Sequence, residues 1–304
     1  MKKGECIMKK KIILLFTSIL TATSLAGCSK SVNSSPLAQA GFDSNQEIQI
    51  ISREDGSGTR GAFIELFGIE KKDNQGNKVD YTTEEATITN STSVMMTTVA
   101  GNPYAIGYIS MGSLNDTVQA LKIDGAVPSA ENIAYGTYKI SRPFYIATKG
   151  APSALVEDFI YYINSTSGTE IIEAAGYIGN KNTKDYAPSS HEGKLIVAGS
   201  SSVTPVMEKL KEGYLTQNPN VTIEIQQSDS TTGMEATAKG ICDIGMASRE
   251  LKDSEKEQGL MGQAIAIDGI AVIVNKENPI QELTAQQVQN IFTGNTLHWS
   301  ELTK

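Results

Sequence analysis

The stretch Ile50-Ile51-Ser52-Arg53-Glu54-Asp55-Gly56-Ser57-Gly58-Thr59-Arg60 decides how this chain of 304 residues is interpreted. It predicts a strand that ends in a glycine turn. A short helix should follow, with Phe63, Leu66 and Phe67 on one face and Gly68 at its end. The start of such a helix offers free backbone N–H groups and a dipole that favours an anion.

The side chains of this turn suit a tetrahedral oxyanion. Gly58 lets the backbone come close to a ligand, and Ser57 and Thr59 add hydroxyl donors. Arg53 adds a planar, two-pronged cation. Asp55 can hold that guanidinium in place or accept a proton from the ligand. The alternative is a helix cap and a surface turn without a ligand, but this combination of residues favours an anion site.

The composition limits the kind of protein. The chain is 39% hydrophobic and 20% charged, and its length suffices for two domains with hydrophobic cores. Residues 1–28 carry five lysines and one glutamate, so the remainder has 21 basic and 33 acidic residues and a net charge of −12. An acidic body argues against nucleic acid as a partner. An anion would therefore be attracted locally, by one arginine and oriented dipoles.

Residues 1–28 have the pattern of a signal peptide: lysines, then the apolar run Ile12–Phe16, then Leu25-Ala26-Gly27-Cys28. The last four residues resemble the lipobox of bacterial lipoproteins, in which the cysteine is acylated and becomes the mature N-terminus. An ordinary secretion signal with an incidental cysteine is the alternative. Either Met1 or Met8 could be the first residue.

Residues 29–45 are expected to form a flexible tether, because Ser29–Gln39 is rich in serine, asparagine and proline. Cys6 lies upstream of the predicted cleavage point, which leaves Cys242 as the only internal cysteine. The sequence therefore predicts neither a disulfide nor a metal cluster, and no cofactor. Cys242 is expected to be a small buried hydrophobic residue.

Strands alternate with helices along the rest of the chain, which predicts the α/β class. Two serine-rich segments each lead from a strand into a helix, Gly199–Pro205 and Ser228–Gly233. Ala264–Ile267 and Gly269–Asn275 are nearly continuous apolar runs, as expected of strands in a sheet that is covered on both faces.

Three further segments are predicted to be helical. Thr87–Gly101 and Pro152–Ser165 place apolar residues at helical spacing. Thr284–Phe292 begins with a capping box formed by Thr284 and Gln287.

Four segments resemble the phosphate-binding proteins of ABC-type phosphate importers, and together they are highly specific. They are Ser52–Arg60, Gly199–Pro205, Asp243–Leu251 and Asp268–Asn275. The resemblance covers nearly all of the chain after residue 46. It implies a two-lobed, type II periplasmic-binding-protein-like fold with the ligand in the cleft between two α/β lobes.

The order of the segments differs from the family pattern, in which the equivalent of Leu195–Lys304 comes first and that of Ile48–Ile178 follows. We interpret this as a circular permutation, which chains tolerate where their termini are close and exposed. A fragment of a tandem array or a truncated gene is the alternative. The resemblance implies one lobe formed by residues 46–138 plus 268–304, and a second formed by residues 139–267.

The resemblance also implies the ligand-binding residues. The family's arginine and Ser-Gly-Thr signature corresponds to Arg53, Ser57, Gly58 and Thr59, with Asp55 conforming. The binding loops of the family's other lobe correspond to segments that contain four serines, which the resemblance therefore implies at the same site: Ser201, Ser202, Ser230 and Ser248. Plain helix N-capping is the alternative role for such serines. If the interpretation is right, Arg53 and Ser201 must line one shared crevice.

Ser248 bears on the choice of anion. Some family members have an aspartate at this position, which accepts a hydrogen bond from the phosphate OH that sulfate lacks. A serine discriminates less sharply than a carboxylate, so Asp55 is the remaining candidate acceptor. Sulfate and molybdate therefore stay open as alternative ligands.

The function that the resemblance implies is capture of inorganic phosphate outside the cytoplasm and its delivery to an importer. The partners would be the permease and ATPase subunits, and the chain would be a monomer held at the cell membrane by lipidated Cys28. The lobes would close about a hinge near Tyr138–Ser141 and Asp268–Ile273. A phosphate sensor or surface-interaction protein on the same fold is an alternative. A phosphatase or serine hydrolase is not favoured, because His191 and His298 are the only histidines and both lie in expected loops.

Overall fold

The computed structural model describes residues 41–181, 183–188 and 190–302. The chain from Gly41 onward forms one compact unit. The predicted signal peptide with Cys28, and the tether up to residue 40, lie outside the described residues. Within the described ranges, no helix combines the length and the apolar character that crossing a membrane requires.

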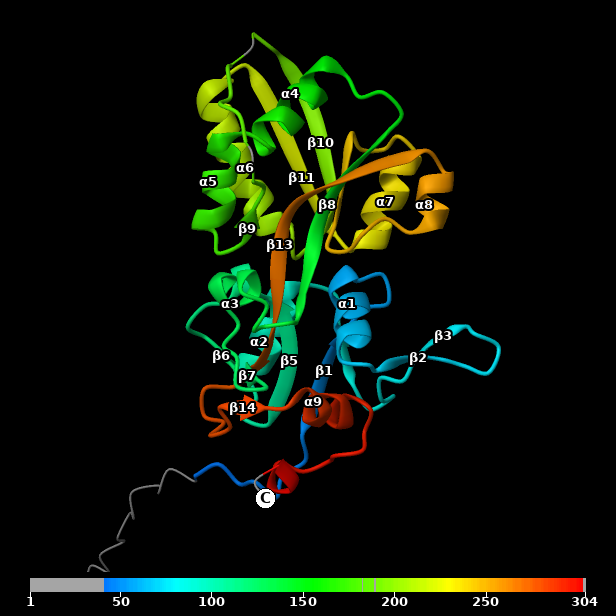
Figure 1. Cartoon of the computed structure of the whole chain (residues 1–304), viewed down its shortest axis with the longest axis vertical. Helices are drawn as coiled ribbons and strands as arrows, with labels where there is room; N and C mark the ends of the chain where they lie inside the picture. The colour runs from blue at the N-terminus through cyan, green and yellow to red at the C-terminus, as the bar shows by residue number, and fades with distance from the viewer. Residues whose placement is uncertain (1–40, 182, 189, 303–304) are drawn as a thin grey trace, which may run out of the picture. The chain divides into compact units, whose positions relative to one another are not determined.

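The secondary structure alternates strands and helices (Figure 1), which confirms the predicted α/β class. The strands are β1 (Gln49–Arg53), β2 (Glu70–Lys72), β3 (Lys78–Asp80), β4 (Thr87–Thr89), β5 (Ala105–Ser110), β6 (Gln119–Ala120), β7 (Lys122–Ile123), β8 (Ser141–Lys149), β9 (Ile178–Gly179), β10 (Gly193–Ser200), β11 (Val221–Ser228), β12 (Ile244–Ala247), β13 (Leu260–Val274) and β14 (Glu282–Leu283). The helices are α1 (Gly58–Leu66), α2 (Thr92–Ala100), α3 (Ala130–Ala134), α4 (Ala154–Ile163), α5 (Thr166–Ala174), α6 (Thr204–Gln217), α7 (Ser230–Ala238), α8 (Asp253–Glu257) and α9 (Ala285–Phe292), with 3₁₀ turns η1 (Met111–Ser113) and η2 (Trp299–Leu302).

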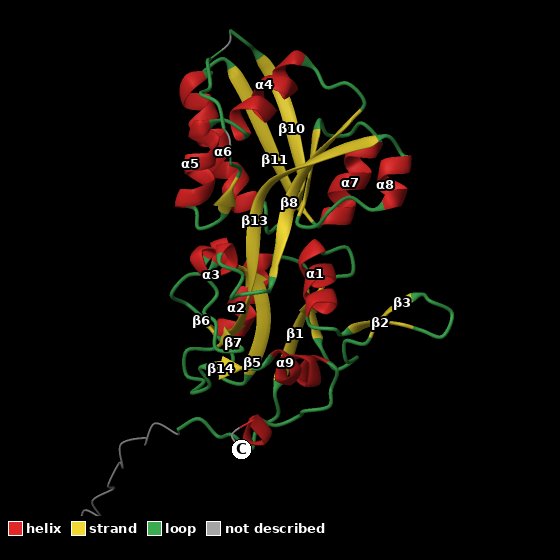
Figure 2. Cartoon of the chain, in the orientation of Figure 1, coloured by secondary structure: helices red, strands yellow, loops and turns green. Residues whose placement is uncertain are grey.

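The main sheet has the strand order β11-β10-β12-β8-β13-β5-β1-β4 (Figure 2). Its two outer groups of strands are parallel, β11-β10-β12 at one end and β5-β1-β4 at the other. The antiparallel strands β8 and β13 join these groups. β13 pairs with β8 from Leu260 to Gly269 and with β5 from Ile270 to Val274. One continuous strand therefore belongs to both ends of the sheet.

The hydrophobic core is divided into clusters that follow this change of partner. We call the elements β1–β7, α1–α3, β14 and α9 the first lobe, whose main cluster includes Phe63, Tyr108 and Trp299. We call α4–α8 and β9–β12 the second lobe, whose main cluster includes Phe159 and Tyr214. All these elements belong to one compact unit, so the predicted boundaries at residues 138 and 268 remain a prediction.

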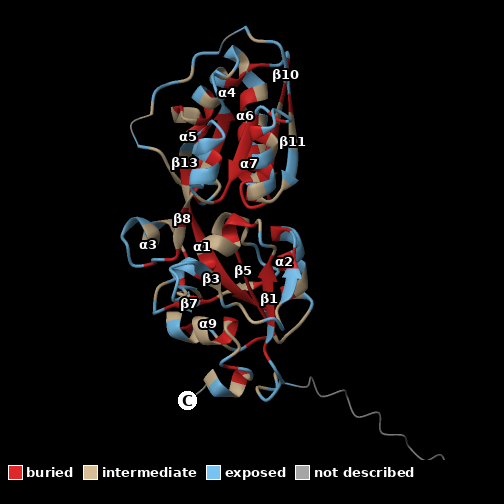
Figure 3. Cartoon of the chain, turned by 90° about the vertical axis from the view of Figure 1, so that its right-hand side faces the viewer, coloured by how far each residue is buried: buried red, intermediate tan, exposed pale blue. Residues whose placement is uncertain are grey.

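The sheet is covered on both faces, as its apolar strands predicted. Ile270, Val272 and Val274 of β13 face one cluster, and the alternate residues Ala271 and Ile273 face another. Figure 3 shows β1 and β5 as mostly buried, whereas the outer strand β11 and the strand β3 are largely intermediate or exposed. The two runs that we predicted as separate strands form the single strand β13. The strand continues through Asp268, the residue that separates the two runs.

Two other predictions need correction. Thr87–Gly101 is not one helix: Thr87–Thr89 forms β4 beside β1, and α2 begins only at Thr92. Leu66 is 39% exposed and does not share the buried face of Phe63. The capping box of Thr284 and Gln287 is confirmed.

The first and last described segments lie side by side. Glu47 and His298 form an antiparallel bridge, and the Ser300 N–H donates to the Ser44 carbonyl at 2.7 Å. Such adjacency is what the predicted circular permutation requires. The permuted order itself remains a prediction.

Candidate anion-binding site

Arg53 lies at the end of β1, where the strand enters the turn that leads to α1. Its side chain is 2% exposed. Nε and Nη2 donate to the two carboxylate oxygens of Glu54 at 2.7 and 2.6 Å, and Nη2 also donates to Ser201 Oγ at 3.1 Å. Nη1 is buried and has no hydrogen-bond partner among the described residues. A buried donor without an acceptor costs about 1–3 kcal/mol, more when charged, so an incoming anion oxygen would relieve this cost.

The first turn of α1 provides the next two groups of the site. Ser57 is the N-cap, and its hydroxyl accepts a hydrogen bond from the Arg60 N–H at 3.3 Å. Thr59 Oγ1 lies 2.8 Å from Ser202 Oγ of the second lobe. Thr59 and Ser202 are each 1% exposed, so this contact between the lobes is shielded from water.

Three serines of the second lobe meet beside Gly58. The Ser248 N–H donates to Ser230 Oγ at 3.1 Å, and Ser200 Oγ donates to Ser248 Oγ at 3.1 Å. A Cβ on Gly58 would lie 2.6 Å from Ser230 Oγ and 2.8 Å from Ser248 Oγ. Only a glycine allows the two lobes to approach so closely at this point.

Thr92 belongs to the same group, although the sequence did not indicate it. Its N–H donates to Ser201 Oγ at 3.3 Å, and its Oγ1 lies 3.3 Å from Ser201 Oγ and 3.2 Å from Ser202 Oγ. Thr92 is the first residue of α2 after the N-cap Ser91. The Asn-Ser-Thr segment at this point is a helix-start signal, but it was hidden inside the helix predicted from Thr87.

We call Arg53, Gly58, Thr59, Thr92, Ser201, Ser202, Ser230 and Ser248 the anion cluster. Six of its eight residues lie at or next to the first turns of α1, α2, α6 and α7, whereas Arg53 ends β1 and Ser248 directly follows β12. Each of these helix starts carries partial positive charge and N–H groups without partners inside the helix. Because the serines of the cluster are at most 3% exposed, these dipoles act in a medium of low dielectric constant.

Asp55 is not part of the cluster. Its side chain is 97% exposed and pairs with Arg60 Nη1 at 3.1 Å. The guanidinium of Arg53, which the sequence led us to connect with Asp55, is held by Glu54 instead. The cause is geometric, because Glu54 directly follows β1 whereas Asp55 already lies at the outside of the turn.

A buried ion pair lies where β8 and β13 run together beside the predicted hinge. Arg142 Nη2 donates to Asp268 Oδ2 at 3.0 Å, and Ser110 Oγ donates to Asp268 Oδ1 at 2.9 Å. Burial raises the pKa of Asp268 to about 6, although Arg142 acts in the opposite direction. Burial also lowers the pKa of Arg142, which the charge of Asp268 partly offsets.

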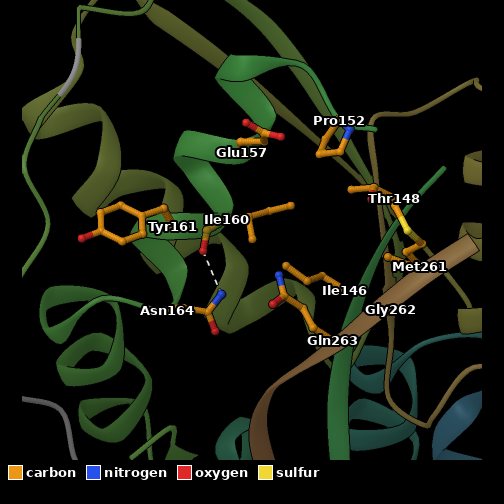
Figure 4. Close-up of a pocket in the computed structure, with 11 residues that line it drawn as sticks. Ile146, Thr148, Pro152, Glu157, Ile160, Tyr161, Asn164, Met261, Gly262 and Gln263 are labelled. Atoms are coloured by element: carbon orange, nitrogen blue, oxygen red, sulfur yellow. Dashed lines mark hydrogen bonds between the residues drawn. The ribbon is translucent and has the colours of Figure 1, made fainter. Parts of the chain in front are cut away.

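A cavity of about 530 Å³ lies elsewhere, in the second lobe (Figure 4). It is lined by α4 and by residues of β8 and β13, among them Ile146, Tyr161 and Gln263. In Figure 4, Asn164 forms its hydrogen bond with the Ile160 carbonyl, at 2.8 Å. Among the described residues that line it, there is no lysine or arginine and no member of the anion cluster. This cavity therefore lacks the charge that an oxyanion site needs.

Two other cavities border the cluster and its surroundings. One, of about 690 Å³, is lined by Thr92 and Ser201 together with Lys209. The other, of about 760 Å³, is lined by Arg142 and Arg249. The first of these cavities borders the anion cluster on the side of α2, whereas the residues given for the second include α1 but no member of the cluster.

Comparison with known proteins identifies the class. The model of the PBP superfamily domain matches residues 31–167 and 184–304. The fold, with polar groups from two lobes meeting at one buried point, is thus that of the PBP superfamily.

Relatives within that class are closely similar. A phosphate-binding protein PstS 2 from Streptococcus agalactiae is 52% identical over 293 residues, which cover 96% of this chain and 97% of the relative. A PstS 2 from Streptococcus pneumoniae is 40% identical over 294 residues, 96% of this chain and 99% of the relative. The crystal structure of a phosphate-binding protein of a phosphate ABC transporter from Streptococcus pneumoniae has a TM-score of 0.67 and 43% identity; the match covers 84% of this chain and all of that one. The chain belongs to the family of PstS phosphate-binding proteins.

Proposed function

We propose that this protein captures inorganic phosphate outside the cytoplasm and delivers it to an ABC-type importer. The names of its relatives support this proposal, since they are phosphate-binding proteins and one belongs to a phosphate ABC transporter. The observation that carries it is the buried Nη1 of Arg53, which has no partner in the part of the chain that the structure describes and belongs to a guanidinium surrounded by hydroxyls from both lobes.

The anion is held by directed hydrogen bonds and not by net charge. Glu54 neutralises Arg53, so the pair adds no formal charge to the site. The hydroxyls of Ser201, Ser202 and Thr59 currently bond to one another or to neighbours, and hydroxyls can rotate to donate to a ligand. Phosphate oxygens thus exchange their hydration shell for N–H and O–H donors already in place.

The binding residues we propose are those of the anion cluster, together with Ser57 at the start of α1. Asp55 is left out because its carboxylate is exposed and paired with Arg60. The acceptor for the phosphate OH is then a serine hydroxyl, for which Ser248 is the best placed. A site of this kind also accommodates sulfate or molybdate, so these anions belong in the binding test.

The lobes close about the segments of β8 and β13 near the Arg142–Asp268 pair, because these are the long strands that run from one lobe to the other. Lipidation of Cys28 would hold the monomeric protein at the membrane beside the permease and ATPase subunits. The division into lobes at residues 138 and 268 is part of the same proposal.

Binding is favoured over catalysis. Among the described residues, no hydrogen bond joins a histidine to a serine of the anion cluster, and His298 pairs with Glu301. A serine nucleophile would need such a base.

Isothermal titration of the chain without residues 1–28 tests the proposal. We expect one phosphate per chain. Arg53→Ala should weaken binding by about 1.5–3 kcal/mol, the value of hydrogen bonds to a charged group, or roughly 10- to 150-fold. Lys71→Ala, which removes an exposed cation of β2, is the matched control and should bind as the wild type does. A flat phosphate titration beside a clear sulfate or molybdate signal would reassign the ligand.

Phosphate uptake by cells that lack the protein separates delivery from sensing. Uptake restored by the wild type but not by Arg53→Ala supports transport. Normal uptake in the deleted cells would favour the sensor or surface-interaction alternative.

A further inference from the structure

We propose that Glu54 is the positioning residue of the anion site: it fixes the guanidinium of Arg53 so that Nη1 faces the bound anion. The inference rests on the proposed function. Its basis is a two-pronged contact in which Nε donates to Oε2 at 2.7 Å and Nη2 donates to Oε1 at 2.6 Å. Such a fork fixes the guanidinium plane as well as its position.

The contact between Arg53 and Glu54 is not what their spacing predicts. Consecutive side chains of a strand point to opposite faces of the sheet. Here β1 ends at Arg53, and Glu54 leaves the strand with its N–H donating to the Thr89 carbonyl at 3.0 Å. The edge strand β4 therefore sets the direction in which the Glu54 carboxylate turns back toward Arg53.

The backbone of Arg53 is fixed as firmly as its side chain. Its N–H donates to the Tyr108 hydroxyl at 3.1 Å, and its carbonyl accepts from Arg60 Nη1 at 2.6 Å. Tyr108 is itself stacked on Phe63, with ring centroids 3.8 Å apart. The backbone is thus anchored by the core, and the one remaining freedom is rotation of the long side chain, which Glu54 removes.

The donors of Arg53 then divide into two sets. Nε and Nη2 are occupied by Glu54 and Ser201, and Nη1 is buried with no partner within the described ranges. Both oxygens of Glu54 already accept from Arg53, so this carboxylate is committed to the arginine. Glu54 therefore acts on the bound anion indirectly: it holds the guanidinium so that Nη1 of Arg53 points toward the anion.

Asp55 supplies a neighbouring carboxylate for comparison. It is 97% exposed and its partner is Arg60, whereas Glu54 is 21% exposed and paired with a buried arginine. Exposed ion pairs contribute little. Replacement of either residue by its amide removes one negative charge from the same turn, so the two variants differ in geometry and not in charge.

The test is a double-mutant cycle with phosphate titrations of wild type, Glu54→Gln, Arg53→Ala and the double variant. We expect Glu54→Gln to bind phosphate at least about tenfold more weakly than the wild type. In the Arg53→Ala background the same change should alter affinity by less than about twofold, because the group it positions is gone. Glu54→Asp, which keeps the charge but shortens the side chain, should recover part of the affinity.

Asp55→Asn is the control and should bind phosphate as the wild type does. Thermal melting without phosphate shows whether each variant is folded, and the double variant remains usable even if Glu54→Gln alone is destabilised by an unpaired Arg53. If Glu54 merely repelled the anion, Glu54→Gln would bind phosphate more tightly in both backgrounds, which overturns the inference.

Equal loss in Asp55→Asn and Glu54→Gln would also overturn the inference, because the loss would then not depend on the contact between Glu54 and Arg53. These failures differ from a failure of the proposed function. In that case the wild type itself would not bind phosphate, and both conclusions would fall.

Discussion

Replacement of Gly58 by alanine should change the affinity for phosphate without lowering the stability of the fold. It separates these two effects more cleanly than removal of a charged residue. The new Cβ would lie 2.6 Å from Ser230 Oγ and 2.8 Å from Ser248 Oγ, so the two lobes could not meet as they do. Overpacking of this kind costs about 1–3 kcal/mol. If this cost falls on the state in which the lobes meet, the affinity drops roughly 5- to 150-fold. The same change favours the helix itself by less than about 1 kcal/mol, the value for a helix interior, because Gly58 is the first residue of α1.

We therefore expect opposite effects on the two measurable quantities. The affinity for phosphate should fall, whereas the melting temperature without phosphate should stay the same or rise. Titration calorimetry measures the first, and thermal unfolding with and without phosphate measures the second. The stabilisation by phosphate should shrink in step with the affinity.

Gly61 offers a matched control three residues further along α1. A Cβ at Gly61 would meet no atom within 4 Å, so Gly61→Ala should raise stability and leave phosphate binding unchanged. The reasoning is refuted if Gly58→Ala binds phosphate within about twofold of the wild type, or if both alanine variants lose affinity equally.

Two further predictions concern the start of α2 and the hinge. Thr92→Val removes the hydroxyl next to Ser201 and should weaken phosphate binding by about 1 kcal/mol, or roughly fivefold by calorimetry, whereas Thr98→Val on the exposed side of α2 should not. Burial raises the pKa of Asp268 to about 6, so between about pH 4 and 6 the folded protein holds a proton that the unfolded chain releases. The contribution of Asp268 to the free energy of unfolding therefore falls as the pH rises through that window. Asp268→Asn should abolish that fall in urea unfolding and, by leaving Arg142 without its counter-ion, lower the unfolding free energy at pH 7 by about 3–5 kcal/mol. An unchanged pH dependence would contradict this assignment.

Local features of the site were predictable because local physics produces them. The strand, glycine turn and helix around Arg53 follow from apolar spacing and turn chemistry within about fifteen residues. The serines at Ser201 and Ser230 stand at helix starts that the sequence marks with a proline or an N-cap. The burial of β13 on both faces was visible in the two apolar runs on either side of Asp268.

Other features were missed where two local signals competed. Thr89 and Thr92 fall in one stretch of helical spacing, yet pairing of β4 with β1 takes its first residues into the sheet. The helix start at Thr92 was hidden for that reason. The choice between Glu54 and Asp55 likewise depended on which way the chain turns after β1, and their order in the sequence does not specify this direction.

By itself, the sequence determined the α/β class and the chemistry of the turn that we propose binds the anion, because hydrogen bonds and burial periodicity act between near neighbours. Only the tertiary structure decided which groups face one another. Arg53 meets Ser201 across 148 positions and Thr92 meets it across 109. Contacts of that range depend on how two cores pack along β8 and β13, and no local preference encodes the result.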